Sequence, residues 1–360
     1  MYLVTNRKLL TGKKGLELFG KDPSEKGPME LRLVKVTRKQ GQWTCKVEGD
    51  ELPKSEVIKL KNKYGLSINE KENWHASLKI ACEIFARAVK EKKSILFFVH
   101  GYNNDVKDVL TTAQQIEKAH NVIVVPFTWP ANGGGAVSGT LSYKSDKSDA
   151  RASEGALDRF IGKIQFFHHL LVEGGKAEAM KKAHDKFPDN PVAAQSMYSR
   201  LIAKKCQTGV SLLCHSMGNY VFKKTLGSSG SSSAKLVFDN ICLVAADTNN
   251  SAHSVWVDKL DVRKRVYIVI NENDYALKAS RIKPGDEQKA RLGHFLKGLN
   301  SETAYYIDVT KAKLVGSDHS YFVGGALNNK KIKWIFSKMF KGETVEERLN
   351  FDASRNLYQL

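Results

Sequence analysis

The middle and C-terminal parts of the chain alternate short apolar runs with segments whose apolar residues recur at helical spacing. Residues 106–120 have the periodicity of an amphipathic helix. The apolar runs lie at residues 94–99, 122–127, 210–214, 236–246, 266–270 and 304–309. Apolar strands separated by helices are typical of a parallel sheet that is covered on both faces. We therefore predict an α/β domain over residues 91–325, followed at 326–360 by a basic helix and a polar tail that trails from the fold.

The N-terminal part of the chain has a different pattern. Residues 31–36 and 42–47 alternate apolar and polar positions, and Gly41 lies in the turn between them, which predicts a β-hairpin. Residues 74–90 carry apolar side chains at helical spacing. We therefore expect a small β-rich N-terminal extension with a linking helix over residues 1–90.

A long insertion separates the second apolar run from the third. Its first part has an amphipathic helical pattern, which Gly174 and Gly175 are expected to break, and a second helix is predicted near residues 192–205. The insertion, about residues 155–206, is either a crossover that covers the sheet or a helical cap over a site, and the pattern leaves both possibilities open. Two glycine-rich or serine-rich stretches are predicted loops, at residues 131–135 and 227–233.

A serine lies at the point where the apolar run at 210–214 changes to a helical pattern. Ser216 is followed by Met217 and Gly218, which matches a nucleophile elbow of the form small-x-Ser-x-Gly. Cys214 takes the place of the usual first glycine, and it is also small. Such a turn exposes the serine hydroxyl and directs the Met217 amide toward the same space, where it favours an oxyanion. His215 completes the string and is expected to support the site.

A second polar string follows the apolar run at 94–99. It reads His100-Gly101-Tyr102, at the carboxyl end of a predicted strand. In this arrangement the backbone amide after the glycine completes an oxyanion hole, so we assign that donor to Tyr102, with Gly101 permitting close approach. His100 is expected to anchor the loop by hydrogen bonds.

A nucleophilic serine needs a histidine base, and three histidines are the main candidates downstream of Ser216. His319 follows the last apolar run through a loop, where the base of such a fold is expected. His294 lies on a predicted helix, and His253 comes too early in the chain. We therefore predict that His319 is the base.

The base in turn needs an orienting carboxylate. Asp274 lies just after the apolar run at 266–270, and Asp247 ends the preceding run. The expected chain order of serine, acid and histidine allows both residues. We favour Asp274 and keep Asp247 as the alternative acid.

Several strings of this chain occur together in a known family. They are FVHGYNN at 98–104, FTWP at 127–130, the spaced residues Tyr143, Asp146, Ala150 and Ser153, HSMGN at 215–219, AAD at 245–247, NDYAL at 273–277, and Gly316 with HSY at 319–321. Over roughly residues 93–323 the chain therefore resembles bacterial α/β-hydrolases long described as a domain of unknown function. The resemblance implies an α/β-hydrolase fold and a triad of Ser216, Asp274 and His319, and it leaves the substrate undefined.

These residues predict hydrolysis of a carboxylic ester, of a small molecule or a lipid, through an acyl-enzyme. The alternative is a catalytically idle hydrolase-fold protein with a binding or scaffold role, whose basic surface recruits an anionic membrane or nucleic acid. No cofactor or metal is expected, because the sequence has neither a Walker-type string nor a cluster of His, Cys and Asp at metal-ligand spacing. The five cysteines are far apart and form no C-x-x-C pair, which fits a reducing compartment.

The chain is strongly basic. It has 57 Lys and Arg against 38 Asp and Glu, a net charge of +19 at pH 7. The basic residues are scattered and form no nucleic-acid motif, so an anionic membrane surface or an anionic substrate is a better expected partner than nucleic acid. No apolar run approaches the roughly 18 residues of a membrane span, and no secretory signal is visible, which predicts a cytoplasmic protein.

Overall fold

The computed structural model describes residues 1–27, 29–131, 147–205, 208–227, 236–281 and 290–360. The predicted loops at 131–135 and 227–233 lie almost entirely outside the described residues, as do Tyr143 and Asp146. The strands are β1 (Tyr2–Thr5), β2 (Arg7–Leu9), β3 (Phe19–Pro23), β4 (Arg32–Lys39), β5 (Gln42–Val47), β6 (Ile95–Val99), β7 (Ile123–Thr128), β8 (Val210–His215), β9 (Asn240–Val244), β10 (Arg265–Ile270), β11 (Ala304–Asp308), β12 (Asn350–Asp352) and β13 (Leu357–Gln359). The α-helices are α1 (Lys54–Tyr64), α2 (Ala76–Glu91), α3 (Val106–His120), α5 (Glu154–Lys186), α6 (Pro191–Lys205), α7 (Gly218–Thr225), α8 (Ser254–Val257), α9 (Tyr275–Ser280) and α10 (Lys330–Phe340).

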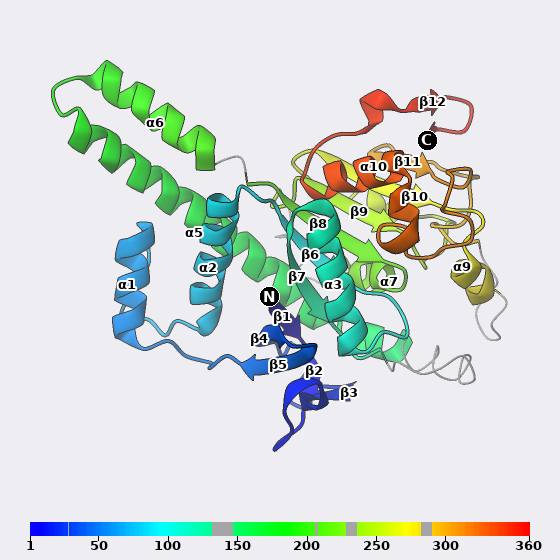
Figure 1. The fold of residues 1–360 in the computed structure, drawn as a ribbon, viewed down its shortest axis with the longest axis horizontal. Coiled ribbons are helices and arrows are strands. Elements are labelled where there is room, and N and C mark those ends of the chain that lie inside the picture. The colour runs from blue at the N-terminus through cyan, green and yellow to red at the C-terminus, as the bar shows by residue number, and fades with distance from the viewer. Residues whose placement is uncertain (28, 132–146, 206–207, 228–235, 282–289) are drawn as a thin grey trace.

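One large sheet forms the centre of the molecule (Figure 1). Its strand order is β12-β13-β11-β10-β9-β8-β6-β7-β1-β4-β5. The strands from β11 to β7 are all parallel, as the alternation of apolar runs and helices predicts. The chain starts this parallel part at β6, adds β7 on one side and then returns to add β8 on the other side. The α/β-hydrolase fold expected from the sequence is therefore present.

Helices cover both faces of the sheet, and the side chains of β6 show how. Leu96 and Phe98 pack into the core that α3 and α10 cover. Phe97 and Val99 point to the opposite face, where Phe97 meets Phe160 of α5 in an edge-to-face contact with ring centroids 5.5 Å apart. Successive residues of a strand face opposite sides, so a strand buried on both sides must be apolar at every position.

The β-rich N-terminal region adds strands to the central sheet. β4 and β5 form the predicted hairpin, and β1 pairs with β4 on one side and with β7 on the other. The β1–β7 pairing is parallel, whereas the pairs within the N-terminal region are antiparallel. β2 and β3 form a separate two-stranded sheet.

The insertion between β7 and β8 is helical, but the predicted break at Gly174 and Gly175 is wrong. α5 runs without interruption from Glu154 to Lys186. A Cβ at position 174 would lie 2.7 Å from the carbonyl oxygen of Tyr64 and 2.9 Å from that of Gly65. Glycine is therefore needed at this position because the end of α1 packs directly against α5, a contact that the local sequence pattern does not reveal.

The two helices of the insertion form a hairpin. α6 packs along the second half of α5 and begins at Pro191, a residue suited to the first turn of a helix. Figure 1 shows α6 at the upper left, far from α7, which follows β8 and packs against α5 on the same face of the sheet. The first half of α5 covers the sheet, and the second half extends away from the edge that carries Ser216.

The C-terminal residues do not trail from the fold as predicted. β12 and β13 form an antiparallel hairpin, and β13 pairs in parallel with β11 at the edge of the sheet. Leu357 is buried, and the Tyr358 ring stacks on Tyr305 with centroids 5.9 Å apart. A few apolar side chains suffice to dock this polar segment because the sheet edge supplies backbone hydrogen bonds.

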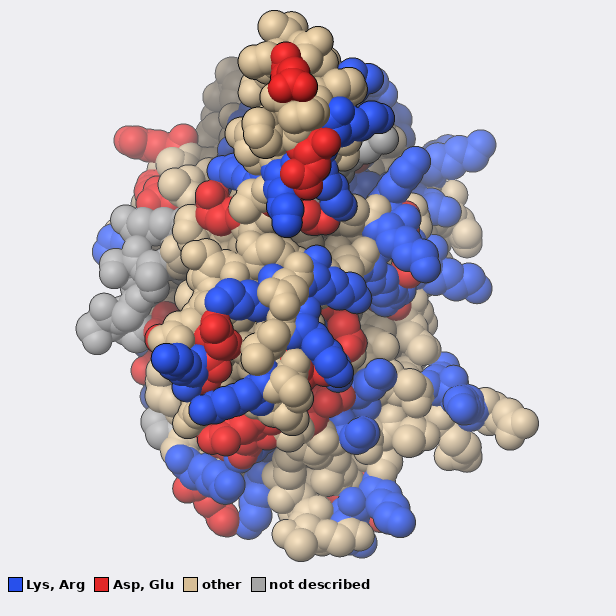
Figure 2. Space-filling view, turned by 90° about the vertical axis from the view of Figure 1, so that its left-hand side faces the viewer, with Lys and Arg blue, Asp and Glu red and all other residues tan. Residues whose placement is uncertain are grey.

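The surface is mixed in charge. Over the side of the molecule seen in Figure 2, Lys and Arg side chains are interspersed with Asp and Glu, and basic side chains are more frequent at the right of that view. Among the described residues, no helix combines the length and the apolar composition that a membrane span requires.

Candidate active site

The carboxyl ends of β6 and β8 lie side by side at the point where the chain reverses its direction across the sheet. Crevices at such switch points are the usual ligand sites of open α/β sheets. Ser216 follows β8 directly and has a φ of 53°, in the left-handed region that residues with side chains rarely adopt. This strained turn is the geometry of a nucleophile elbow.

Small residues make the turn possible. A Cβ at Gly218 would lie 2.5 Å from the carbonyl oxygen of Val99, so only glycine fits where α7 crosses the end of β6. Asn219 is fully buried, and its amide donates to the carbonyl oxygens of Cys214 and Ser216, at 2.9 and 3.0 Å. Asn219 is part of the sequence motif, but only the structure shows that its side chain holds the turn by hydrogen bonds.

The loop after β6 lies against the candidate nucleophile. A Cβ at Gly101 would be 2.6 Å from the Cβ of Ser216 and 3.2 Å from its hydroxyl oxygen. The Met217 N–H, at the start of α7, makes no hydrogen bond with the described part of the chain. Gly101 therefore brings the Tyr102 segment next to Ser216, as the predicted oxyanion hole of Tyr102 and Met217 requires.

His100 anchors this loop. Its Nδ1 donates to the carbonyl oxygen of Gly101 at 2.8 Å, and its Nε2 accepts from the Trp129 N–H at 3.2 Å. The imidazole stacks on the Trp129 ring with centroids 5.2 Å apart. Burial, and next the charge of Arg7, lower the pKa of His100 to about 3, so the ring is neutral at pH 7. These contacts are the anchoring role predicted for His100.

Arg7 also lies beside this loop, and no sequence motif points to it. Its guanidinium is buried and donates to the carbonyl oxygens of Asn104 and Ala131, at 3.0 and 3.3 Å. Its Nε donates to the Thr128 hydroxyl at 3.1 Å. Arg7 thus ties the N-terminal region to the segments that follow β6 and β7. An isolated arginine near the N-terminus carries no sequence signal for this role.

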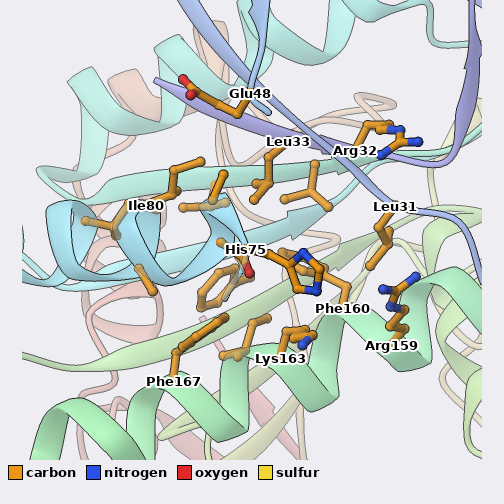
Figure 3. A pocket seen from close by; sticks show the side chains of 18 of the residues that line it. Leu31, Arg32, Leu33, Glu48, His75, Ile80, Arg159, Phe160, Lys163 and Phe167 are labelled. Atoms are coloured by element: carbon orange, nitrogen blue, oxygen red, sulfur yellow. The ribbon is translucent and has the colours of Figure 1, made fainter. Parts of the chain in front are cut away.

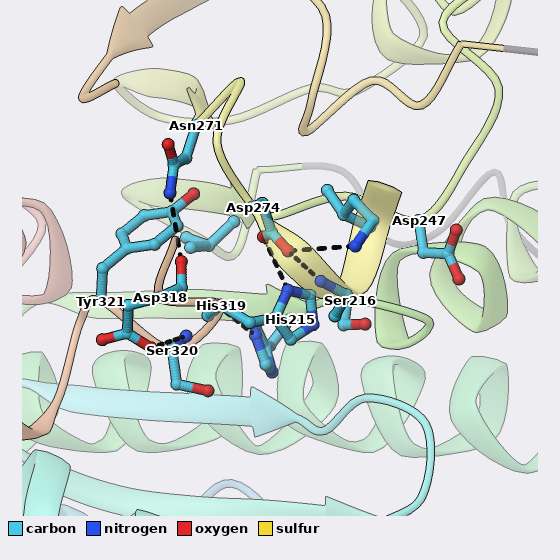
Figure 4. Close-up of polar contacts among 12 residues, drawn as sticks. His215, Ser216, Asp247, Asn271, Asp274, Asp318, His319, Ser320 and Tyr321 are labelled. Carbon is cyan, nitrogen blue, oxygen red and sulfur yellow. Dashed lines mark hydrogen bonds and ion pairs between the residues drawn. The ribbon is translucent and has the colours of Figure 1, made fainter. Parts of the chain in front are cut away.

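His319 and Asp274 are joined directly (Figure 4). His319 Nδ1 donates to Asp274 Oδ2 at 2.7 Å, and the carboxylate is fully buried. The other oxygen, Oδ1, accepts from the backbone N–H groups of Ala276 and Leu277, so that Asp274 also caps the amino end of α9. A carboxylate held on both oxygens has a fixed orientation, and it fixes the tautomer and the orientation of the imidazole.

Two buried side chains hold the loop that carries His319. His215 Nε2 donates to the backbone carbonyl oxygen of His319 at 3.0 Å, and the two rings lie 4.6 Å apart. The Asn271 amide donates to the carbonyl oxygens of Gly316 and Asp318, at 3.0 and 3.1 Å (Figure 4). Burial, and next the proximity of His319, lower the pKa of His215 well below its usual range, so that His215 is a neutral hydrogen-bond donor.

Ser216 and His319 lie near each other without a hydrogen bond between their side chains. Neither the Ser216 hydroxyl nor His319 Nε2 has a hydrogen-bond partner within the described part of the chain. The serine hydroxyl rotates about a single bond, and such contacts often shorten only when substrate is bound.

The alternative residues have other partners. Asp247 lies in an almost fully buried ion pair with Arg291, at 3.1 Å, and also accepts from the Ser280 hydroxyl. His253 bonds to the Asn250 carbonyl oxygen and to the Tyr306 hydroxyl. His294 is buried, and in the described structure its ring nitrogens make no hydrogen bond. The structure therefore places Asp274, rather than Asp247, against His319.

Of the residues that the structure describes, no three His, Cys, Asp or Glu side chains are grouped so that they could hold a metal ion. The described cysteines are unpaired, and burial raises the pKa of the Cys214 thiol, next to the elbow, well above its usual range.

Comparison with known proteins agrees with the fold. The family model described as alpha/beta hydrolase of unknown function (DUF900) matches residues 80–169 and 179–318, which is more than half of the chain. No curated protein sequence and no solved structure gives a significant match. The matched residues include the elbow, the His100 loop and Asp274, and they end one residue before His319. This chain belongs to the alpha/beta hydrolases of unknown function (DUF900).

Proposed function

We propose that the protein is a serine hydrolase that cleaves a carboxylic ester through an acyl-enzyme on Ser216. The observation that carries the proposal is the conjunction of a strained serine at the end of β8 with a buried Asp274–His319 pair. A structural serine has no need of a left-handed backbone, a fixed imidazole nearby and a glycine loop in contact with it.

The reaction follows from these positions. His319 Nε2 accepts the hydroxyl proton of Ser216 as the oxygen attacks the acyl carbonyl, and Asp274 stabilises the imidazolium that forms. The amides of Tyr102 and Met217 stabilise the oxyanion of the tetrahedral intermediate. The imidazolium then gives its proton to the leaving alcohol. Water, deprotonated by the same imidazole, attacks the acyl-enzyme, and the imidazolium returns the proton to Ser216 Oγ as the acid leaves.

The basic surface favours a substrate that is itself anionic, or a lipid that lies in an anionic membrane. The net charge of +19 attracts such substrates over distances of about a Debye length, roughly 8 Å at physiological salt. Sedimentation with neutral and anionic vesicles checks this part of the proposal. If the same fraction of the protein sediments with neutral and with anionic vesicles, an anionic membrane is not the surface on which it acts.

The test uses a fluorophosphonate probe and short-chain nitrophenyl esters. We expect wild-type protein to be labelled and to turn over the esters, and we expect Ser216→Ala to lose labelling and at least about a thousandfold of the kcat. The matched control is Ser211→Ala, since Ser211 lies on the same strand and its buried hydroxyl lacks a partner within the described structure. Unlabelled, inactive wild-type protein would instead favour an idle binding or scaffold role.

A further inference from the structure

A cavity of about 620 Å³ lies between helices α2 and α5 and one face of the sheet. The adjacent strands β8, β6, β7, β1 and β4 all contribute side chains to its floor. Ile80 of α2 and Phe160 and Phe167 of α5 line its walls (Figure 3). The described lining residues include none of the residues assigned to the Ser216 site. This cavity is therefore a second site, on the face of the sheet rather than at the carboxyl ends of its strands.

The size and lining of the cavity suit an apolar ligand. Protein interiors are normally packed as densely as organic crystals. Here α2 and α5 leave a space within the range of about 300–1,000 Å³ that is typical of small-molecule sites. Each methylene group that enters such a space from water contributes about 0.8 kcal/mol.

Two cations stand at one end of the cavity. Arg159 and Lys163 are one turn apart on α5, and Figure 3 shows both at the side of the cavity where Leu31 lies. The Arg159 guanidinium donates to the carbonyl oxygen of Met29, and the Lys163 ammonium lies 6.0 Å from the centre of the Phe167 ring. Neither cation has a carboxylate partner among the residues that the structure describes. Like charges at this spacing repel each other, and an anion between them relieves the repulsion.

Among the described residues, the acidic side chains of the lining make no ion pair with these two cations. Glu30 and Asp50 both pair with Arg32. Glu48 lies at the opposite side of the cavity from Arg159 and Lys163 in Figure 3, and Glu51 is exposed. The cavity thus has an apolar interior and, at one end, two cations that have no carboxylate partner in the described structure.

We propose that this cavity binds the anion of a long-chain fatty acid. The acyl chain lies along the apolar floor of the sheet, and the carboxylate lies between Arg159 and Lys163. A charged head group on a single apolar chain satisfies both features of the cavity, whereas a neutral apolar ligand leaves the two cations without a partner. The proposal concerns a site apart from Ser216, so it stands whether or not Ser216 is a nucleophile.

Titration calorimetry of the full chain with myristate tests the proposal, and the neutral alcohol tetradecanol is the chain-matched probe. We expect Lys163→Glu to weaken myristate binding at least about tenfold and to change tetradecanol binding less than about threefold. Lys181→Glu is the matched control, since it makes the same charge change on the same helix outside the described lining, and its affinities should stay within about twofold of wild type.

A second variant keeps the test independent of charge. Ala81 on α2 lines the cavity, and Ala81→Phe fills part of it. We expect this variant to bind both myristate and tetradecanol more weakly than wild type. Circular dichroism checks that each variant is folded. A dissociation constant above about 0.1 mM for myristate and the wild-type protein would overturn the proposal. The proposal would also be overturned if neither variant changed the affinity for either probe. The same holds if Lys163→Glu weakened the binding of myristate and of tetradecanol equally.

Discussion

His215, the residue before the candidate nucleophile, donates a hydrogen bond from Nε2 to the backbone carbonyl oxygen of His319, the candidate base, at 3.0 Å. The same side chain is buried and neutral, and its ring packs against Phe322. A single residue thus connects the turn after β8 to the loop after β11. This hydrogen bond holds the Ser216 turn and the His319 loop next to each other.

Replacement of His215 should therefore impair the reaction without removing a reacting group. We expect His215→Ala to lower kcat by about 10- to 100-fold with little change in KM, because a small displacement of a base is costly. His215→Gln retains a side-chain N–H donor and should recover part of the loss. Ester turnover and probe-labelling rates measure both variants. Equal kcat values for the two variants would show that His215 does not act through this hydrogen bond.

The two candidate carboxylates should give opposite phenotypes. Asp274→Asn leaves a side chain of the same size but favours the wrong imidazole tautomer, so we expect kcat to fall by about three to four orders of magnitude. Asp247→Asn removes the carboxylate charge from the buried ion pair with Arg291, so we expect a loss of about 3–5 kcal/mol in the free energy of unfolding. Urea unfolding and ester kinetics on both variants separate the two roles. A larger loss of kcat in Asp247→Asn than in Asp274→Asn would reverse the assignment.

Arg7 should act as a positioning residue for the loop after β6. A lysine at this position keeps the charge but loses the planar fork that reaches Asn104 and Thr128. We expect Arg7→Lys to lower kcat about tenfold while KM changes little, because the oxyanion donors are displaced. The comparison is made well below the melting temperature of the variant. Unchanged kcat together with a lower melting temperature would assign Arg7 to stability alone.

Two glycines of α5 should respond in opposite ways to alanine. Gly162 has no atom within 4 Å of a new Cβ, so Gly162→Ala should stabilise the protein by about 0.5–1 kcal/mol. Gly174→Ala brings its Cβ to 2.7 Å from the Tyr64 carbonyl oxygen and should destabilise by about 1–3 kcal/mol. Urea midpoints of the two variants test this pair. Stabilisation by both changes would mean that α1 does not pack closely on α5.

Acid should destabilise the fold through buried neutral histidines. Burial lowers the pKa of His100 to about 3 and that of His120 to about 4, against an ordinary value of 6.5. The unfolded chain therefore binds more protons between these values, and the free energy of unfolding falls as the pH decreases below 6.5. Each such histidine contributes about 1.4 kcal/mol per pH unit in that range.

Urea unfolding at pH 7, 6 and 5 measures this dependence. We expect His120→Gln to reduce the slope of stability against pH below 6.5, whereas His184→Gln, at an exposed position of α5, should leave the slope unchanged. An identical slope in wild type and His120→Gln would mean that His120 takes up its proton equally in the folded and unfolded chain.

The sequence alone determined the features that depend on local geometry. Apolar runs such as the one in β6 require burial on both faces, and the string around Ser216 requires a tight strand-to-helix turn. Gly218 could be identified in advance because it belongs to the elbow string around Ser216, although the atom that requires a glycine there, the Val99 carbonyl oxygen, lies on a distant strand. The α/β fold, the order of its elements and the candidate residues therefore followed from the pattern.

Only the tertiary structure decided the features that depend on distant segments. Whether Asp274 or Asp247 lies against His319 depends on how the loops after β9, β10 and β11 pack together, and the sequence allows both. In the sequence Gly174 resembles a helix breaker, but in the structure it allows the end of α1 to pack against α5. The polar C-terminus resembles a free tail in the sequence, but β13 pairs with the edge strand β11. Arg7 and the cavity between α2 and α5 join segments far apart in the chain. Their contacts form only on folding, so no local pattern encodes them.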